Sequence, residues 1–249
     1  MMARQHALSG LFVGCLTAGA LAPAPIPVKA LTVAVAGGAA LVPDLDHPSA
    51  TVARSLGIVT RLLAVAIDRA SLALYHATRA EGDPGQRRSG HRLVTHTVPG
   101  CLVTAAVVGL LCLAHPLAGA AAACLLVGLL GLGVRALGGG AALTAGGVTW
   151  WLLTYEFFWW WTIPLATFVG AFAHVIGDTF TNSGTPLWWP LLRDGRRWRL
   201  VTTPATFSTG DYVETMLVAP LLVFATALAS LWPLGVVPLL FHLLASGSA

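Results

Sequence analysis

Gly90-His91-Arg92-Leu93-Val94-Thr95-His96-Thr97 places two imidazoles and a guanidinium directly in front of an apolar run, residues 98–114. The segment before it is hydrophilic and basic. Such a boundary is typical of a membrane helix just leaving the interface. Ionisable side chains are costly to bury there, so we expect them to serve a site, and we interpret the stretch as one wall of a polynuclear metal site.

Composition sets the class of protein. The mean hydropathy is +0.78, only 10% of the residues are charged, and several apolar runs approach the length that crosses a bilayer. A soluble protein is excluded on these grounds. The 249 residues suffice for a single all-α domain, 1–249, a polytopic membrane helical bundle of about six to eight short or broken spans. The net charge of +4 is modest, and no nucleic-acid partner is expected.

The first two apolar runs, 5–22 and 28–42, are separated by three prolines and predict a helical hairpin. The second run ends at Pro43-Asp44-Leu45-Asp46-His47-Pro48. A hairpin returns to the side it left, so His6, Asp44 and Asp46 face the same leaflet. The alternative for the first run is a signal peptide cleaved near Ala24.

The remaining segments alternate between polar and apolar. Residues 49–80 predict an amphipathic helix that lies on the membrane or caps the site, or else a charged helix of an extramembrane layer. Further spans are expected at 98–114, 117–134, 165–180, 212–231 and, shorter than a full span, 233–244. A tryptophan-rich span, 141–162, holds Glu156 as the one carboxylate at its depth, with tryptophans near both ends. Residues 81–89 and the basic stretch 181–210 predict loops.

Charge placement orients this topology. With the first residues in the cytoplasm, all of the 14 lysines and arginines except Lys29 fall on the cytoplasmic side. The positive-inside rule therefore predicts a multi-pass protein of the cytoplasmic membrane, with its polar clusters on the cytoplasmic face.

Those clusters supply candidate metal ligands. His174 and Asp178 are four residues apart, so both point to one side of a helix. Imidazoles and carboxylates without sulfur favour zinc, although manganese, iron or magnesium can use the same groups, and so many ligands predict two or more ions. The candidate ligands are His6, Asp44, Asp46, His91, His96, His174 and Asp178.

Each ligand also has an ordinary interpretation. His6 can be an interfacial side chain, Asp44 and Asp46 can cap a helix, and His174 can hydrogen-bond Asp178. The case rests on their convergence at one leaflet. Three other histidines are left out of the site, and the four cysteines are interpreted as small core residues: His76, His115, His242, Cys15, Cys101, Cys112 and Cys124.

Three separated motifs resemble the YdjM-like family of bacterial inner-membrane metal-dependent hydrolases. They are Pro43-Asp44-Leu45-Asp46-His47-Pro48, His91-Arg92 with Thr95-His96, and His174 with Asp178. The resemblance implies a hydrolase with distant kinship to zinc-dependent phospholipase C, and its motifs map onto the ligands above together with His6. Asn182 departs from the family pattern, where a proline is common.

We therefore expect a membrane-bound hydrolase that cleaves a phosphoester or phosphoanhydride of a lipid-linked or amphiphilic substrate by metal-activated water. His47 is a further ligand or acid–base group, and Thr95 orients a ligand. Arg92, and less directly the arginines of the basic loop, can hold phosphate oxygens. The rival is a metal-binding sensor or transporter, for which Glu156 would matter more, and a third possibility is a structural metal site.

Overall fold

The computed structural model describes residues 1–55, 57–83, 85, 87–134, 139–191 and 195–236. Within these ranges the chain is all-helical, as predicted, apart from two isolated bridges, Thr181 to Phe207 and Thr185 to Val201, in the expected basic loop. His242, which the sequence analysis leaves out of the site, lies outside the described residues, as do Arg135 and Arg193 among the predicted cytoplasmic arginines and most of the 233–244 run.

The element order is α1 (Ala3–Ala20), α2 (Ile26–Ala39), η1 (Pro43–Asp46), η2 (Val52–Arg54), α3 (Ile58–Thr78), η3 (Val94–His96), α4 (Val98–Ala114), α5 (Pro116–Val134), α6 (Gly139–Tyr155), η4 (Phe157–Trp159), α7 (Thr162–Thr179), η5 (Glu214–Val218) and α8 (Ala219–Ser230). Three stretches are long and apolar enough to cross a membrane: Ile26–Asp46, Pro116–Val134 and Phe157–Thr179. Val98–Ala114 and Glu214–Ser230 are apolar but shorter.

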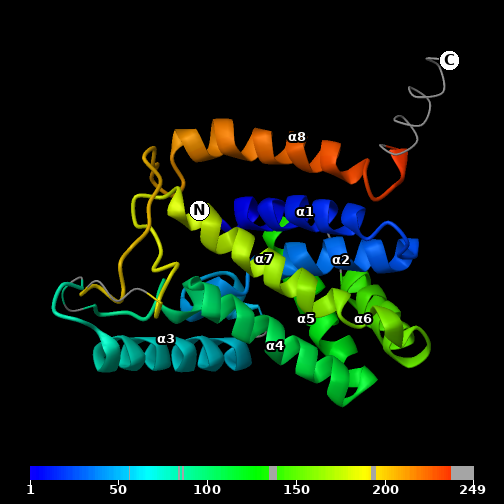
Figure 1. The fold of residues 1–249 in the computed structure, drawn as a ribbon, viewed down its shortest axis with the longest axis horizontal. Helices are drawn as coiled ribbons and strands as arrows, with labels where there is room; N and C mark the ends of the chain where they lie inside the picture. Colours follow the sequence, from blue (N-terminus) through cyan, green and yellow to red (C-terminus); the bar gives the residue numbers. More distant parts are fainter. Residues whose placement is uncertain (56, 84, 86, 135–138, 192–194, 237–249) are drawn as a thin grey trace.

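The helical bundle forms around α2. The predicted hairpin of α1 and α2 is present, α7 and α5 pack on α2, and α8 covers the outer side of α1 (Figure 1). The core is built of small and branched side chains such as Val35, Leu126 and Ala166. Gly170 lets α7 approach α2 closely, because a Cβ there would overlap the carbonyl oxygen of Ala36. Small residues at contacts of this kind are the usual means of packing apolar helices in lipid.

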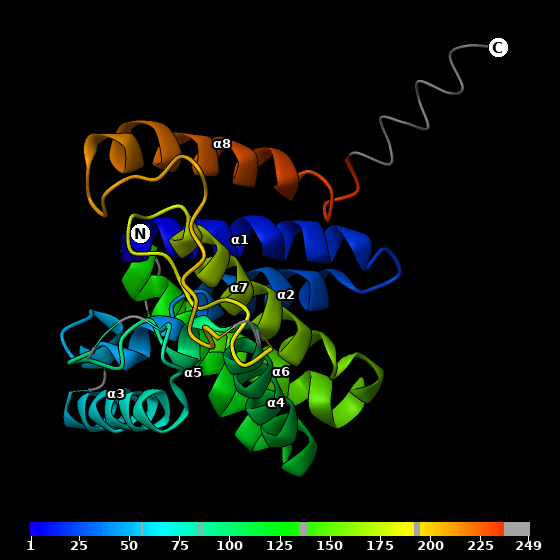
Figure 2. The ribbon, with the colours of Figure 1, turned by 60° about the vertical axis from the view of Figure 1, so that its left-hand side comes forward.

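Helix α3 stands apart from the bundle. It is foreshortened in Figure 2, where α1 and α8 are seen side-on, so it does not run parallel to them. Its inner face is buried, with Thr60, Ala64, Ser71 and Tyr75 turned inward, and it packs on η1 and η2. An opposite face of apolar residues that includes Leu62 is exposed. The helix therefore packs beside the site, and its exposed surface carries apolar residues together with Arg61 and Arg69.

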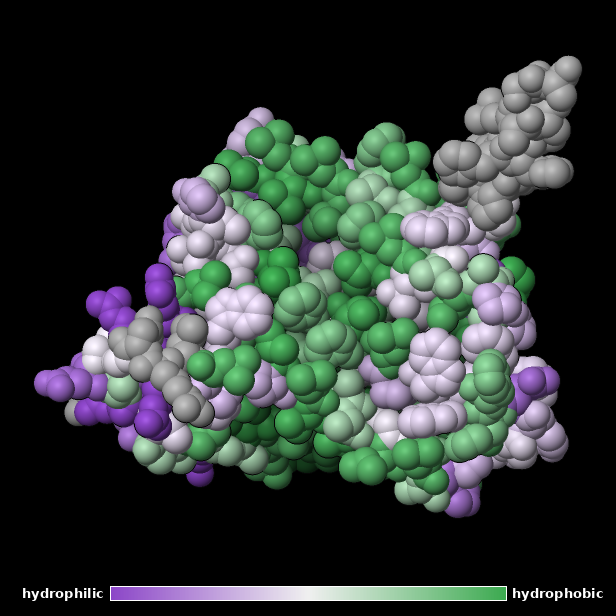
Figure 3. All heavy atoms as spheres, viewed as in Figure 1, coloured by the Kyte–Doolittle hydropathy of each residue, from purple (hydrophilic) through white to green (hydrophobic). Residues whose placement is uncertain are grey.

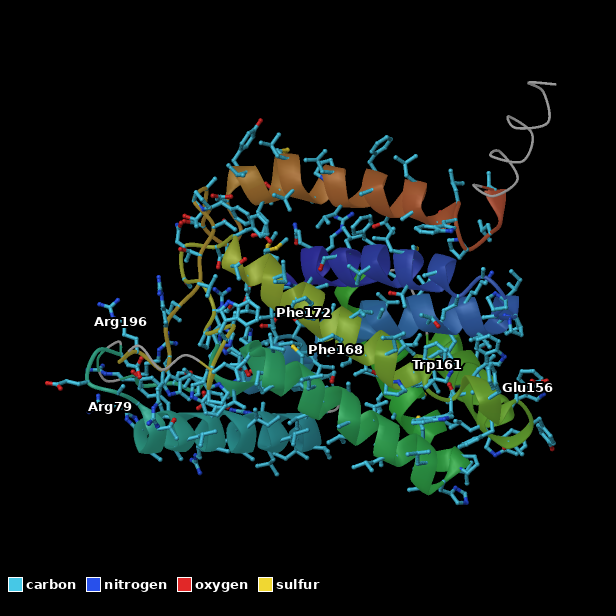
Figure 4. The ribbon with its side chains drawn as sticks, in the orientation of Figure 1. Arg79, Glu156, Trp161, Phe168, Phe172 and Arg196 are labelled. Carbon is cyan, nitrogen blue, oxygen red and sulfur yellow. The ribbon has the colours of Figure 1, made fainter. Side chains whose placement is uncertain are left out.

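The tryptophan-rich segment is not one span. Helix α6 ends at Tyr155, η4 makes a turn, and α7 begins at Thr162, two residues before Pro164. The prediction of a continuous 141–162 span is wrong, because the chain reverses at Glu156, which is exposed in this turn. The tryptophans of the segment therefore flank one turn. Figure 4 places Glu156 and Trp161 far from Arg79 and Arg196, at the opposite end of the molecule.

The surface divides in the same way. In Figure 3 hydrophobic residues cover the middle of the molecule, and the most hydrophilic ones gather mainly at the end where α3 and the basic loop lie. We call this end, which also holds the beginning of α1 and the end of α7, the polar end.

Candidate metal site

The candidate ligands meet at the polar end because four helix ends converge there. The first turn of α1 and the last turn of α7 lie beside η1, which follows α2, and beside η3, which precedes α4. The seven candidate ligands on these helix ends are all buried or half-buried. The residues that meet are the predicted ones: His6, Asp44, Asp46, His91, His96, His174 and Asp178.

Three acceptor atoms form the centre of the cluster. His96 Nε2 lies 3.1 Å from His174 Nε2, and Asp178 Oδ2 lies 3.5 Å from the former and 3.6 Å from the latter. Zinc ligands about 2.0–2.1 Å from a tetrahedral ion are roughly 3.3–3.4 Å apart. The three atoms therefore have the mutual spacing of ligands around one ion.

Hydrogen bonds on the outer ring nitrogens fix the tautomers of these histidines. His174 Nδ1 donates to the carbonyl oxygen of Ala40 (2.7 Å). His96 Nδ1 donates to the Thr95 hydroxyl (3.0 Å), whose own hydrogen is donated to Asp46 Oδ2. Each Nε2 is then left with its lone pair pointing inward. Asp178 Oδ2 is buried without a hydrogen-bond partner. Buried acceptors without a donor are costly, and a cation satisfies all three at once.

Electrostatics at His96 also favour positive charge. Burial disfavours the imidazolium, but Asp46 and Asp178 outweigh it and raise the pKa of His96 to about 9. The same carboxylates that stabilise this proton attract a metal ion, which needs the neutral ring and competes with the proton.

Two more residues extend the cluster. The ring of His6 stacks on that of His174 with centroids 3.6 Å apart, and its Nε2 lies 3.3 Å from Asp178 Oδ1. Asp44 Oδ1 is 3.7 Å from His174 Nε2. With His91 they make three overlapping groups whose ligand atoms lie within 4.8 Å of one another: His6, Asp44, His174; Asp44, His91, His96; and His96, His174, Asp178. This overlap suits more than one ion.

Asp46 belongs to none of these groups. Its carboxylate is fully buried, and its oxygens accept from His91 Nδ1 (2.7 Å), the backbone N–H of Arg92 (3.0 Å) and the Thr95 hydroxyl. Such a carboxylate orients histidines from behind. The structure thus places Asp46 and Thr95 beside the candidate ligands His91 and His96, and Asp46, predicted as a ligand, lies outside the three ligand groups.

Arg92 closes the cluster on its outer side. Its Nη2 pairs with Asp178 Oδ1 (3.0 Å), and its Nη1 donates to the Thr181 hydroxyl (2.8 Å). Its backbone is left-handed, with φ 58°, a conformation that non-glycine residues seldom adopt outside functional positions. The guanidinium has further N–H groups beyond these two contacts, and its side chain is partly exposed.

The loop before His91 is held by α3. Asp68 Oδ1 accepts from the Ser89 hydroxyl (2.8 Å) and from the backbone N–H of Gly90 (2.7 Å). A Cβ at Gly90 would overlap the carbonyl oxygen of Asp68. Only glycine therefore lets the loop lie this close to α3, which sets the position of His91.

His47 stands at the edge of the site. Its ring is 4.5 Å from that of His91, centroid to centroid, and its Nδ1 lies 2.9 Å from the Ser49 hydroxyl. Burial, followed by the neighbouring His91, lowers the pKa of His47. It is not in the three ligand groups. The excluded His76 and His115 are exposed and stand outside them as well.

Sequence analysis missed several contributors. Glu214 is completely buried and accepts from the backbone N–H groups of Met2 and Gly210, which ties the chain before α1 to η5. A lone carboxylate inside the 212–231 apolar run was the signal for it. The α-amino group of Met1 donates to Asp178 Oδ1 (2.7 Å), again placing positive charge beside this carboxylate.

Comparisons with known proteins agree with this picture. A family model described as YdjM inner membrane protein matches residues 1–247. No curated protein and no solved structure matches the chain.

Proposed function

We propose, from the premise that the chain belongs to the YdjM family of inner membrane proteins, that it is a metal-dependent hydrolase. Its substrate is a lipid-linked or amphiphilic molecule, of which it cleaves a phosphoester or phosphoanhydride bond. The observation that carries the proposal is the convergence of His96 Nε2, His174 Nε2 and the unpartnered Asp178 Oδ2 at the spacing of metal ligands.

The donor set suits zinc. His96, His174 and Asp178 would hold one ion, while Asp44, with His6 on one side and His91 on the other, offers positions for another. Nitrogen and carboxylate ligands without thiolate are those of hydrolytic zinc sites, which keep a position open for water. Manganese or iron could use the same atoms.

The chemistry would follow from this arrangement. A bound divalent ion lowers the pKa of a coordinated water and polarises the phosphoryl group. In a hydrolysis so assisted, the water oxygen would bond to phosphorus as the bond to the leaving oxygen breaks, and a proton of that water would end on the leaving oxygen. Asp46 holds the rings of His91 and His96 in place throughout. Arg92 would bind a phosphoryl oxygen through its free N–H groups, and His47 would carry the proton.

The site would face the cytoplasm. Arg79 and Arg196 lie at the polar end with the ligands, whereas Glu156 lies at the other end (Figure 4). Arginines are retained on the cytoplasmic side of membrane proteins. In this orientation the candidate ligands would lie at the depth of the inner-leaflet headgroups. The three candidate spans would make the protein multi-pass.

A transporter or sensor is the competing proposal, and the bundle interior argues against transport. A path across the membrane needs polar groups along its length. The buried Thr32 and Thr167, further along α2 and α7, instead donate to the helix carbonyls of Val28 and Ile163. Glu156 is exposed in the far turn and not buried at mid-depth.

The test combines metal analysis with turnover in one preparation. Detergent-purified protein is assayed by elemental mass spectrometry and for release of para-nitrophenol from phosphodiester and phosphomonoester substrates. Asp178→Asn keeps the shape of the side chain but removes its charge, so we expect bound metal and turnover to be lost together. Glu156→Gln, an isosteric change at the opposite end, is the matched control and should keep both.

Two results would contradict the proposal in different ways. Bound metal that is unchanged in Asp178→Asn would exclude the ligand assignment. Stoichiometric metal in the wild type without turnover of any phosphoester would favour a sensor, a transporter or a structural site.

A further inference from the structure

A cavity of about 260 Å³ lies beside the ligand cluster and has no part in the chemistry described above. It is bounded by the start of α1, the end of α2, the loop after η1 together with η2, and the last turns of α5. Its lining is largely apolar and includes Leu41, Val52, Leu129 and Leu132.

The cavity reaches the ligand cluster at Asp44. Asp44 is part of its lining, and Oδ1 of its carboxylate lies 3.7 Å from His174 Nε2. Asp44 is also among the cluster residues that keep some exposure, since its side chain is 20% accessible whereas His96 and His174 have none. A molecule that fills the cavity therefore ends next to a ligand of the proposed ion.

The cavity also borders the lipid-facing side of the bundle, through Leu132. Leu117, Leu125 and Leu132 share one face of α5, a candidate membrane span, and all three are exposed. Exposed leucines on a span face hydrocarbon. Leu132 is on this face and also lines the cavity. A group can thus pass from the bilayer into the cavity without crossing water.

We propose that this cavity holds the hydrocarbon chain of the substrate and receives it sideways from the membrane. The apolar lining would bind the alkyl chain, and Asp44 marks where the chain meets the phosphate head at the metals. The inference rests on the proposed hydrolase function, and it specifies the substrate as an amphiphile with a linear alkyl, acyl or prenyl chain. An apolar wall contributes binding energy for each methylene it covers.

Two leucines of α5 make a matched test. Leu132→Trp would fill the cavity, whereas Leu125→Trp places the same bulk on the same lipid-facing surface outside it. Turnover is compared for para-nitrophenyl hexadecyl phosphate and para-nitrophenyl methyl phosphate, which share a leaving group. We expect Leu132→Trp to lower the long-chain to short-chain ratio of kcat/KM by about tenfold or more. Leu125→Trp should keep the wild-type ratio, and bound metal should be unchanged in both variants.

A second readout does not depend on hydrolysis. A non-hydrolysable hexadecyl phosphonate with a photoreactive diazirine at the end of its chain is cross-linked to the protein, and the labelled peptides are mapped. Labels within 41–52 and 129–133 that are lost in Leu132→Trp but kept in Leu125→Trp would support chain binding in the cavity. If these labels appear and neither ester is hydrolysed, the cavity inference stands and only the proposed hydrolase function fails. Equal labelling of the two variants, or an unchanged ratio of kcat/KM, would overturn the inference.

Discussion

Asp46 and Asp178 are buried carboxylates in opposite hydrogen-bonding states. Asp46 has donors on both oxygens, from His91 on one side and from Arg92 and Thr95 on the other. Asp178 has donors on Oδ1, whereas its Oδ2 lies 3.5 Å from His96 Nε2 and 3.6 Å from His174 Nε2 and has no hydrogen-bond donor. A carboxylate with donors on both oxygens has less capacity left for a metal ion, whereas a buried oxygen without a donor is stabilised by a cation. The two residues, which look equivalent in sequence, therefore differ in role.

Replacing Asp46 should weaken metal binding without abolishing it. In Asp46→Asn the ligands stay, but an amide NH₂ faces donor groups, so His91 and His96 lose their orientation. Carboxylates in this position typically contribute about 10–100-fold to metal affinity, and we expect a loss of that size in competition titrations with a chelator. Unchanged affinity, or a protein with no detectable metal, as expected for Asp178→Asn, would contradict the assigned role.

At this scale the sequence predicts which residues gather but not what each does. The hairpin topology was sufficient to bring His6 next to Asp44, because helix direction alone fixes that proximity. The split between Asp46 and Asp178 depends on angstrom-level donor positions, which no spacing encodes. The lone carboxylate of Glu214 in an apolar run indicated a buried group, but its partners are backbone N–H groups, which no residue type in the sequence marks.

Among the elements, α3 holds the loop before His91 in position through Asp68. The contact is close, since the backbone N–H of Gly90 donates to Asp68 and no Cβ fits between the two chains. We expect Gly90→Ala to destabilise the protein by about 1–3 kcal/mol, because the loop must move away from the helix. Thermal unfolding in detergent measures this loss, and metal affinity should fall with it.

Gly85 provides the control for that substitution. It lies in the same loop, and a Cβ there would meet nothing within 4 Å. Gly85→Ala should therefore leave the unfolding temperature within error of the wild type. If both alanine variants unfold alike, α3 does not position the loop.

The elements were predicted best where local signals mark both ends. Helix α4 has the predicted bounds, because the Thr97 hydroxyl accepts from the Gly100 N–H at its start and Pro116 follows its end. The break at Glu156 carries no proline or glycine, so residues 141–162 appear continuous. Only the carboxylate itself indicated that this point lies outside the hydrocarbon.

The whole molecule is polar at one end, and that asymmetry gives a topology test. Arg196 and Glu156 lie at opposite ends (Figure 4). In intact cells, a membrane-impermeant maleimide should label Glu156→Cys and not Arg196→Cys, while permeabilised cells should label both. The native Cys15, Cys101 and Cys112 are buried, and replacing the half-buried Cys124 with serine provides a quiet background. Labelling of Arg196→Cys in intact cells would reverse the proposed orientation.

At the scale of the molecule, composition and charge predicted most of what the structure describes. Hydropathy indicated an all-helical membrane protein, and the distribution of arginines over the predicted spans distinguished its two sides. The cavity beside Asp44 lay beyond sequence analysis, because its walls come from four elements whose packing decides whether a void remains.

The left-handed backbone at Arg92 sets a limit on how far this protein can be stabilised. A non-glycine residue in that region costs roughly 1–2 kcal/mol, and the chain accepts the cost at the one position whose guanidinium contacts both Asp178 and Thr181. A glycine there would relax the backbone and delete the guanidinium in the same step. The relaxed backbone would therefore be offset by the loss of an ion pair with the buried Asp178, which typically costs about 3–5 kcal/mol, so even variants evolved for stability alone should keep arginine at this position.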